Sequence, residues 1–169
     1  MKMLIILFSF VAIGFNLPAQ ADSTQIDSAQ YYFDKANNSN DYKIIIDNYT
    51  KAIKVNPDYA DAYYARGWAY ISLGIYQFAI NDFDSLIRIN PDYADAYYAR
   101  GFAYDDLGNY QQAIDDYSSA IKINPNNAKA YLFRGTAKWN LKLECCGDFK
   151  KACELDDQEA CSWFSSQCK

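Results

Sequence analysis

Apolar residues recur at steps of three and four along most of the chain, which is the spacing of one face of an α-helix. One run of this kind consists of Tyr110, Ala113, Ile114, Tyr117 and Ile121. A matching run earlier in the chain consists of Tyr76, Ala79, Ile80, Phe83 and Ile87. A second helical stripe precedes each run. The pattern therefore predicts an all-α protein built from pairs of helices.

Turn residues separate the predicted helices. Gly74 and Gly108 follow the first helix of two pairs, and glycine adopts the left-handed conformation of a helix C-terminus most easily. A proline follows each second helix, where it prevents the helix from continuing; these residues are Pro57, Pro91 and Pro125. Each pair is thus predicted to be two helices joined by a short turn.

The pairs belong to an internal repeat. The segment NPDYADAYYARG begins at Asn56 and again, unchanged, at Asn90, and a weaker copy, NPNNAKAYLFRG, begins at Asn124. These starts are 34 residues apart. A constant interval of this length is typical of repeat architectures, in which neighbouring units stack on one another.

The chain resembles tetratricopeptide repeat proteins, whose pattern is aromatic, Gly, aromatic, Ala, aromatic and Pro at fixed offsets. One unit meets it with Tyr63, Gly67, Tyr70, Ala79, Phe83 and Pro91, and the next with Tyr97, Gly101, Tyr104, Ala113, Tyr117 and Pro125. The resemblance implies an all-α fold, an α-solenoid in which antiparallel helix pairs form a right-handed superhelix.

The repeat interval divides the chain into units. We expect a degenerate first repeat over residues 22–59 as an N-terminal cap, repeats over 60–93 and 94–127, a shortened repeat over 128–157 and a capping helix over 158–169. In the first unit Ala29, Phe33 and Ala36 fall at the signature positions. In the fourth, the alignment places a two-residue deletion in the turn after Leu141.

Residues 1–21 have a different pattern, that of a signal peptide. Lys2 precedes an apolar run over residues 4–15, and Ala19-Gln20-Ala21 forms a small-x-small cleavage site. The run is shorter than the ~20 residues that span a bilayer. We expect an exported protein, periplasmic or secreted, with no stable membrane insertion after cleavage. A buried first helix or a permanent anchor is the alternative.

The cysteines lie together near the C-terminus, and an exported chain meets oxidising conditions that favour disulfides. Cys146 and Cys153 share one helix face, as do Cys161 and Cys168 on the following helix. If residues 155–157 form the turn, the antiparallel helices pair Cys153 with Cys161 and Cys146 with Cys168. The spacing also resembles that of cysteine-rich helical repeats of some secreted bacterial proteins, in which it marks a disulfide.

The remaining cysteine, Cys145, aligns with the small residue Ala113 and is expected to be a buried free thiol. Zinc binding by the cysteines is the alternative, but the chain has no Cys-x2-Cys motif and no histidine. We therefore predict neither a metal nor a cofactor.

The absence of histidine also removes the common nucleophile systems of enzymes. Adjacent acids occur at Asp105-Asp106, Asp115-Asp116 and Asp156-Asp157. Since neighbouring helical residues diverge, these doublets are interpreted as solvated surface, and no catalytic residue is predicted. A glycosidase that uses two carboxylates is the remaining alternative.

The net charge of −5 and the scattered basic residues argue against nucleic acid as a partner. A protein or peptide partner that is neutral to basic is more compatible with this charge. Arg66, Arg100 and Arg134 recur before each repeated glycine. Their periodicity favours a structural role, such as bonding a neighbouring helix end or an aspartate, over ligand contact.

The resemblance implies that the first helix of each pair lines a concave groove. The expected groove residues are Asp61, Tyr64, Trp68, Ile71, Asp95, Tyr98, Phe102, Asp105, Lys129, Leu132, Thr136 and Trp139. This aromatic strip with flanking acids predicts a non-catalytic scaffold that binds a protein or peptide. The aromatics alternatively pack between pairs. Other possible functions are a self-assembling structural component and a carbohydrate-binding or cell-wall-associated module.

Overall fold

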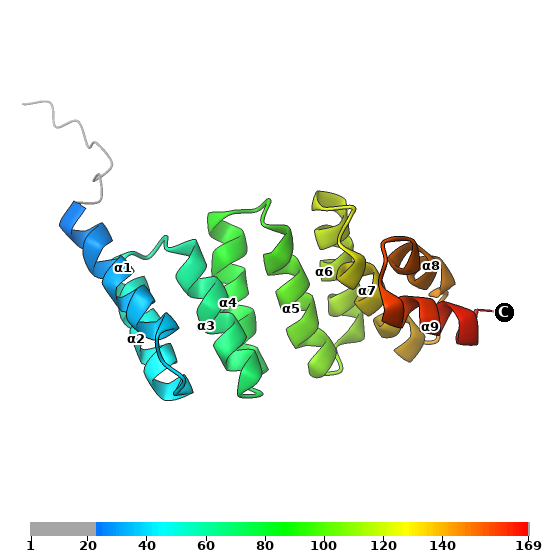
Figure 1. Ribbon diagram of the computed structural model, residues 1–169, viewed down its shortest axis with the longest axis horizontal. Helices are drawn as coiled ribbons and strands as arrows, with labels where there is room; N and C mark the ends of the chain where they lie inside the picture. The colour runs from blue at the N-terminus through cyan, green and yellow to red at the C-terminus, as the bar shows by residue number, and fades with distance from the viewer. Residues whose placement is uncertain (1–22, 169) are drawn as a thin grey trace, which may run out of the picture.

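A computed structural model describes residues 23–168, and these residues form helices joined by short connections, without strands (Figure 1). The predicted signal peptide lies outside the described residues. The helices are α1 Ser23–Asn37, α2 Tyr42–Val55, α3 Ala60–Ser72, α4 Tyr76–Ile89, α5 Ala94–Asp106, α6 Tyr110–Ile123, α7 Ala128–Asn140, α8 Cys146–Glu154 and α9 Gln158–Gln167.

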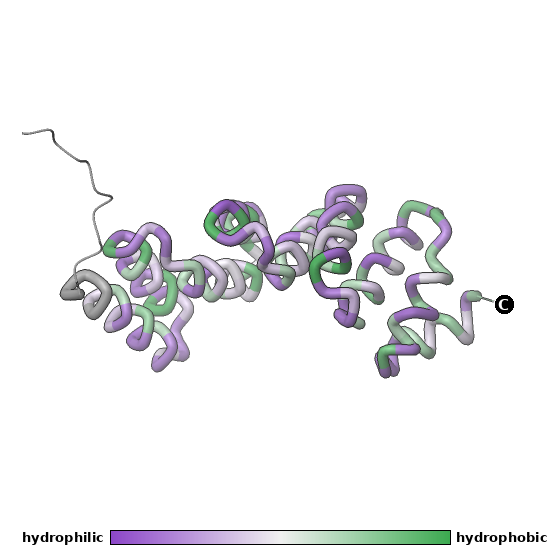
Figure 2. The backbone as a smooth tube through the Cα atoms, turned by 90° about the horizontal axis from the view of Figure 1, so that it is seen from above, coloured by the Kyte–Doolittle hydropathy of each residue, from purple (hydrophilic) through white to green (hydrophobic). Residues whose placement is uncertain are grey.

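Consecutive helices pack against one another, and the pairs follow each other along the long axis from α1 to α9 (Figures 1 and 2). The first helices of successive pairs also touch, α3 with α5 and α5 with α7. This close approach makes their side of the stack the inner, shorter side. The predicted all-α solenoid of helix pairs is confirmed.

The repeated glycines lie where the two helices of a pair come closest. A Cβ atom added to Gly67 would lie 2.7 Å from the ring of Phe83, and one added to Gly101 would lie 3.0 Å from the ring of Tyr117. Both rings are fully buried. The family pattern of a small residue opposite an aromatic is therefore a packing requirement.

In three of the pairs the turn contains one residue in the left-handed conformation, as the sequence predicted at two of them. Gly74 and Gly108 have φ angles of 70° and 75°. In the fourth unit Lys142 takes this conformation, with φ 58°.

The fourth unit differs from its prediction, because the deletion does not shorten the turn. Residues 141–145 separate α7 from α8, whereas residues 73–75 separate α3 from α4. The deletion instead removes the start of the second helix, so that α8 has 9 residues where α6 has 14. The carbonyl of Cys145 accepts hydrogen bonds from the amides of Asp148 and Phe149, which fixes the later helix start.

The alignment predicted for the first unit, which places Phe33 at the position of Gly67, is also wrong. Phe33 packs against Tyr49 at 5.4 Å and Tyr59 at 5.1 Å between ring centroids. Tyr64 makes the equivalent two contacts one unit later. Phe33 therefore corresponds to Tyr64 and not to Gly67, because α1 is placed by these ring contacts and not by the repeat interval.

The C-terminal helices are joined covalently. Disulfides link Cys146 to Cys168 and Cys153 to Cys161, the same pairs that the sequence analysis expected. Cys145 is a buried free thiol. Between the helices, the ring of Trp163 stacks on that of Phe149 at 5.4 Å. α9 thereby covers the end of the stack as the first helix of a further pair would.

Candidate functional site

The candidate site is the inner face, defined here by the predicted groove residues on α3, α5 and α7. Exposed members of this set are Asp61, Asp95, Lys129 and Trp139. Partly buried members are Tyr64, Trp68, Ile71, Tyr98, Phe102, Asp105 and Thr136.

Leu132 does not belong to the surface of this face. Its side chain is 1% exposed and packs in a core cluster with Phe149, Ala152 and Ala160. Ala160 comes from α9, which covers α7 at this point. The prediction that Leu132 lines the groove is therefore wrong, because the capping helix occupies the space in front of it.

The aromatic residues of the inner face form a row across successive pairs. The ring of Trp68 lies 5.9 Å from that of Phe102, and Phe102 lies 5.6 Å from Phe133. Trp68 also contacts the core ring Phe83. These aromatics thus pack between pairs, as the alternative interpretation of the sequence expected, while part of their surface stays accessible.

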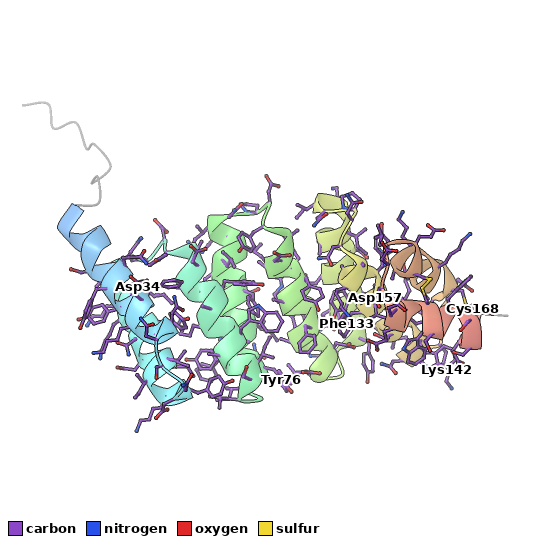
Figure 3. The ribbon with its side chains drawn as sticks, viewed as in Figure 1. Asp34, Tyr76, Phe133, Lys142, Asp157 and Cys168 are labelled. Carbon is purple, nitrogen blue, oxygen red and sulfur yellow. A yellow bond between two sulfur atoms is a disulfide. The ribbon has the colours of Figure 1, made fainter. Side chains whose placement is uncertain are left out.

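Phe133 is a member of this row that the sequence analysis missed. Phe133 is part of α7 (Figure 3). Its ring contacts Tyr98 and Phe102 of α5 and Tyr117 of α6. The sequence did contain a sign of this role, because the third copy of the repeated segment has Phe133 where the two identical copies have Ala65 and Ala99.

The charges of the inner face are mostly negative and unpaired. Asp61, Asp95 and Asp105 form no ion pair among residues 23–168. Lys129 is engaged, with its Nζ 3.2 Å from an oxygen of Asp157. Burial, the nearby Tyr64 and the negative charge of Asp95 raise the pKa of Tyr98 to about 12.

The repeated arginines are structural, as predicted. Each donates hydrogen bonds to both carboxylate oxygens of an aspartate on the second helix of its own pair. The pairs are Arg66 with Asp82, Arg100 with Asp116 and Arg134 with Asp148. Their positive charges are therefore not free to bind a ligand.

The interpretation of the acid doublets as solvated surface is wrong for two members. Asp116 is buried because it receives Arg100. Asp157 is buried at the start of α9, where it accepts a hydrogen bond from the amide of Ala160. Although burial opposes ionisation, this amide and Lys129 lower the pKa of Asp157.

A pocket of about 530 Å³ lies at the connection between α7 and α8, and it is lined by Trp139, Asn140, Lys142, Leu143, Glu144, Cys145 and Cys146. The Trp139 ring, which also contacts Trp163 at 6.0 Å, forms part of its wall.

Within the described part of the chain, no three His, Cys, Asp or Glu side chains are grouped so as to hold a metal ion. No helix of residues 23–168 has the length and hydrophobicity of a membrane span.

Comparisons with known families agree with this architecture. The family described as tetratricopeptide repeat matches residues 94–127, and the one described as TPR repeat matches residues 40–74 and 67–108. No curated protein matched the chain.

Solved structures of the same fold were found. MamA is 32% identical, with a TM-score of 0.69, over 81% of this chain and 79% of MamA. The TPR domain of Arabidopsis OM64 is 25% identical, with a TM-score of 0.65, over 68% of this chain and 98% of that domain. The chain belongs to the tetratricopeptide repeat family.

A further similar structure contains a peptide. The first TPR of Spaghetti (RPAP3), bound to the HSP90 peptide SRMEEVD, is 27% identical to this chain with a TM-score of 0.65. The match covers 69% of this chain and 98% of that domain.

Proposed function

We propose that this protein is a non-catalytic scaffold whose inner face binds a protein or peptide that is neutral to basic. One observation carries the proposal: a row of partly accessible aromatics lies beside aspartates that have no ion-pair partner among the described residues. Aromatic side chains are frequent anchors of protein interfaces. The aspartates supply a charge that a basic partner would complement.

The charge of the face distinguishes the proposed partner from the peptide bound by the RPAP3 domain. That peptide, SRMEEVD, is rich in acidic residues. Here Arg66, Arg100 and Arg134 are held by aspartates, whereas Asp61 and Asp95 are exposed and unpaired within residues 23–168. Like charges across an interface are unfavourable, so an acidic tail is a poor partner for this face.

The proposal includes export. The N-terminal pattern of a signal peptide supports it, as do the disulfides Cys146–Cys168 and Cys153–Cys161, since disulfides persist in oxidising compartments. The scaffold would therefore meet its partner in a periplasmic or secreted setting.

The test is a pull-down from the exported fraction of the source organism, with the full protein carrying Asp61→Lys and Asp95→Lys. The matched control carries Asp58→Lys and Asp92→Lys, which make the same charge change in the exposed turns just before α3 and α5. We expect the first variant to lose a partner that the native and control proteins retain, with unchanged helical content by circular dichroism.

Equal retention by both variants would contradict binding on the inner face. If no partner is retained and the native protein elutes as a dimer or larger species, self-assembly replaces the proposal. Release of sugar from a cell-wall glycan would instead favour the glycosidase alternative.

A further inference from the structure

The repeats over residues 60–93 and 94–127 differ at two positions beside the inner face. In the unit over residues 60–93, Ile71 packs against a core cluster that contains Phe83. The next unit has Asp105 in place of Ile71 and Tyr117 in place of Phe83. An apolar pair is thus replaced by a polar pair, although the segment that begins each unit is identical.

The Tyr117 hydroxyl is buried without a partner. Its ring packs beside Gly101 and stacks on Phe133 with centroids 6.2 Å apart, and the side chain is 0% exposed. The hydroxyl forms no hydrogen bond with any described residue. Leaving a buried polar group unpaired is unfavourable, so the folded protein is less stable with tyrosine at this position than it would be with the phenylalanine of the preceding unit.

Asp105 is the neighbouring acid, and it too lacks a partner. Its Oδ1 atom is enclosed and unpaired, while the residue as a whole keeps part of its surface accessible. Burial and the adjacent Asp106 raise the pKa of Asp105 to about 6, so it is mainly ionised at neutral pH. The Tyr117 ring packs on Gly101, one turn before Asp105 on α5, so the two side chains lie at neighbouring levels of the α5–α6 contact.

Basic side chains of α5 and of the following first helix, α7, are already used. Arg100 binds Asp116 and Asp84, and Lys138 binds Asp148. No other ion pair reaches Asp105 within residues 23–168. The unit thus carries an ionised carboxylate and a phenol that its own side chains do not satisfy.

We propose that the accessible part of Asp105 forms a subsite for a lysine or arginine side chain of the partner, and that the buried Tyr117 supports it from within the core; this inference rests on the proposed binding function of the inner face. The ammonium or guanidinium group of that side chain donates a charge-assisted hydrogen bond to the accessible carboxylate of Asp105. The aliphatic stem lies along Phe102, one turn earlier on α5, and along Phe133. The subsite selects a basic residue at one position of the bound segment.

The chain supplies its own control for this subsite. The double substitution Asp105→Ile and Tyr117→Phe copies the residues of the preceding unit and preserves the packing that Phe83 has against Gly67. Asp105→Asn is a second variant that keeps the shape of the side chain. Asp106→Asn makes the same charge change at the adjacent exposed residue.

The probe is a phage library of random heptapeptides, selected against the full protein secreted from its expression host. A selected peptide is then synthesised with each lysine or arginine replaced in turn by norleucine, and affinities are measured by fluorescence anisotropy at pH 7.5. We expect enrichment of Lys or Arg. At one position, norleucine should weaken binding to the native and Asp106→Asn proteins about 10-fold or more. The Asp105→Ile/Tyr117→Phe and Asp105→Asn proteins should show little such change, which is the coupling of a double-mutant cycle.

Two other outcomes have different meanings. Peptides selected without basic enrichment, or a norleucine effect that persists in both Asp105 variants, would overturn the subsite and leave peptide binding in place. Selection of no peptide by the native protein would overturn the proposed binding of a peptide on the inner face, and the subsite with it.

Discussion

Arg100 and Asp116 join the two helices of one repeat through a two-point ion pair. The Nε atom donates to Oδ2 at 2.8 Å and Nη2 to Oδ1 at 2.6 Å. Nη1 of the same guanidinium reaches Asp84 on the second helix of the preceding pair. One arginine thus links α5, α6 and α4, and Arg66 and Arg134 repeat the arrangement through Thr50 and Ser118.

The substitution Asp116→Ala should be strongly destabilising, because it leaves the partly buried Arg100 without its main partner. Breaking one side of a buried pair costs about 3–5 kcal/mol, and the remaining contact with Asp84 places the expected loss near ~3 kcal/mol. Urea unfolding followed by circular dichroism measures it. Asp115→Ala, at the adjacent exposed residue, should change stability by less than about 0.5 kcal/mol; equal effects would contradict the role of the pair.

Gly67→Ala should destabilise the protein although alanine favours helix. The added Cβ would lie 2.7 Å from the Phe83 ring, and overpacking of this kind costs about 1–3 kcal/mol. Gly147 in α8 is the control, because no neighbouring heavy atom would lie within 4 Å of its Cβ. Gly147→Ala should leave the thermal midpoint unchanged or raise it. A rise for Gly67→Ala would show that the helices can separate without cost.

The pairing of the cysteines predicts how many thiols react, and a thiol-specific reagent can count them. Unfolded in denaturant without reductant, the protein should expose a single reactive thiol, that of Cys145, because the other cysteines are paired. In the folded protein this thiol should react slowly, since it is 5% exposed and burial raises its pKa.

Cys146→Ser with Cys168→Ser should loosen α9 selectively. Loss of a disulfide typically costs about 2–4 kcal/mol, and α9 is attached only at the end of the stack. Amide hydrogen exchange should become faster in residues 158–167 and stay unchanged in α3–α5. Uniform acceleration would indicate instead that the cap holds the whole solenoid together.

The raised pKa of Asp105 predicts a pH-dependent effect of Asp105→Asn. Because the folded state binds the proton more tightly than the unfolded state, ionising Asp105 lowers stability as the pH rises from about 4 through about 6. The variant should therefore melt higher than the native protein above pH 6, and the difference should vanish near pH 4.

The groups that act with Asp105 are Asp106 on α5 and Tyr117 on α6, while Lys138 on α7 is paired with Asp148. Asp106→Asn is the control, and it should give a smaller dependence on pH. Thermal midpoints at pH 4, 5, 6 and 7.5 measure both. A constant difference across this range would show that Asp105 titrates normally.

Features of the sequence that depend on local geometry predicted the structure well. Helical spacing located the helix pairs, and Gly74 and Gly108 located their left-handed turns, because backbone preference acts within a few residues. The spacing of Cys146, Cys153, Cys161 and Cys168 also depends only on helical period and one turn. The repeated glycines and aromatics could be assigned because the family pattern records the contact between them.

Tertiary structure alone decided what covers each helix face. Leu132 has the same place in its repeat as Tyr64 and Tyr98, yet α9 buries it. Asp116 and Asp115 are neighbours, but only Asp116 meets an arginine. Helical period determines the direction of a side chain from its own axis, whereas its exposure depends on elements far away in the sequence. For that reason the sequence determined the repeated helix pairs of this protein, and the packing of those pairs decided which inner-face residues remain available to a partner.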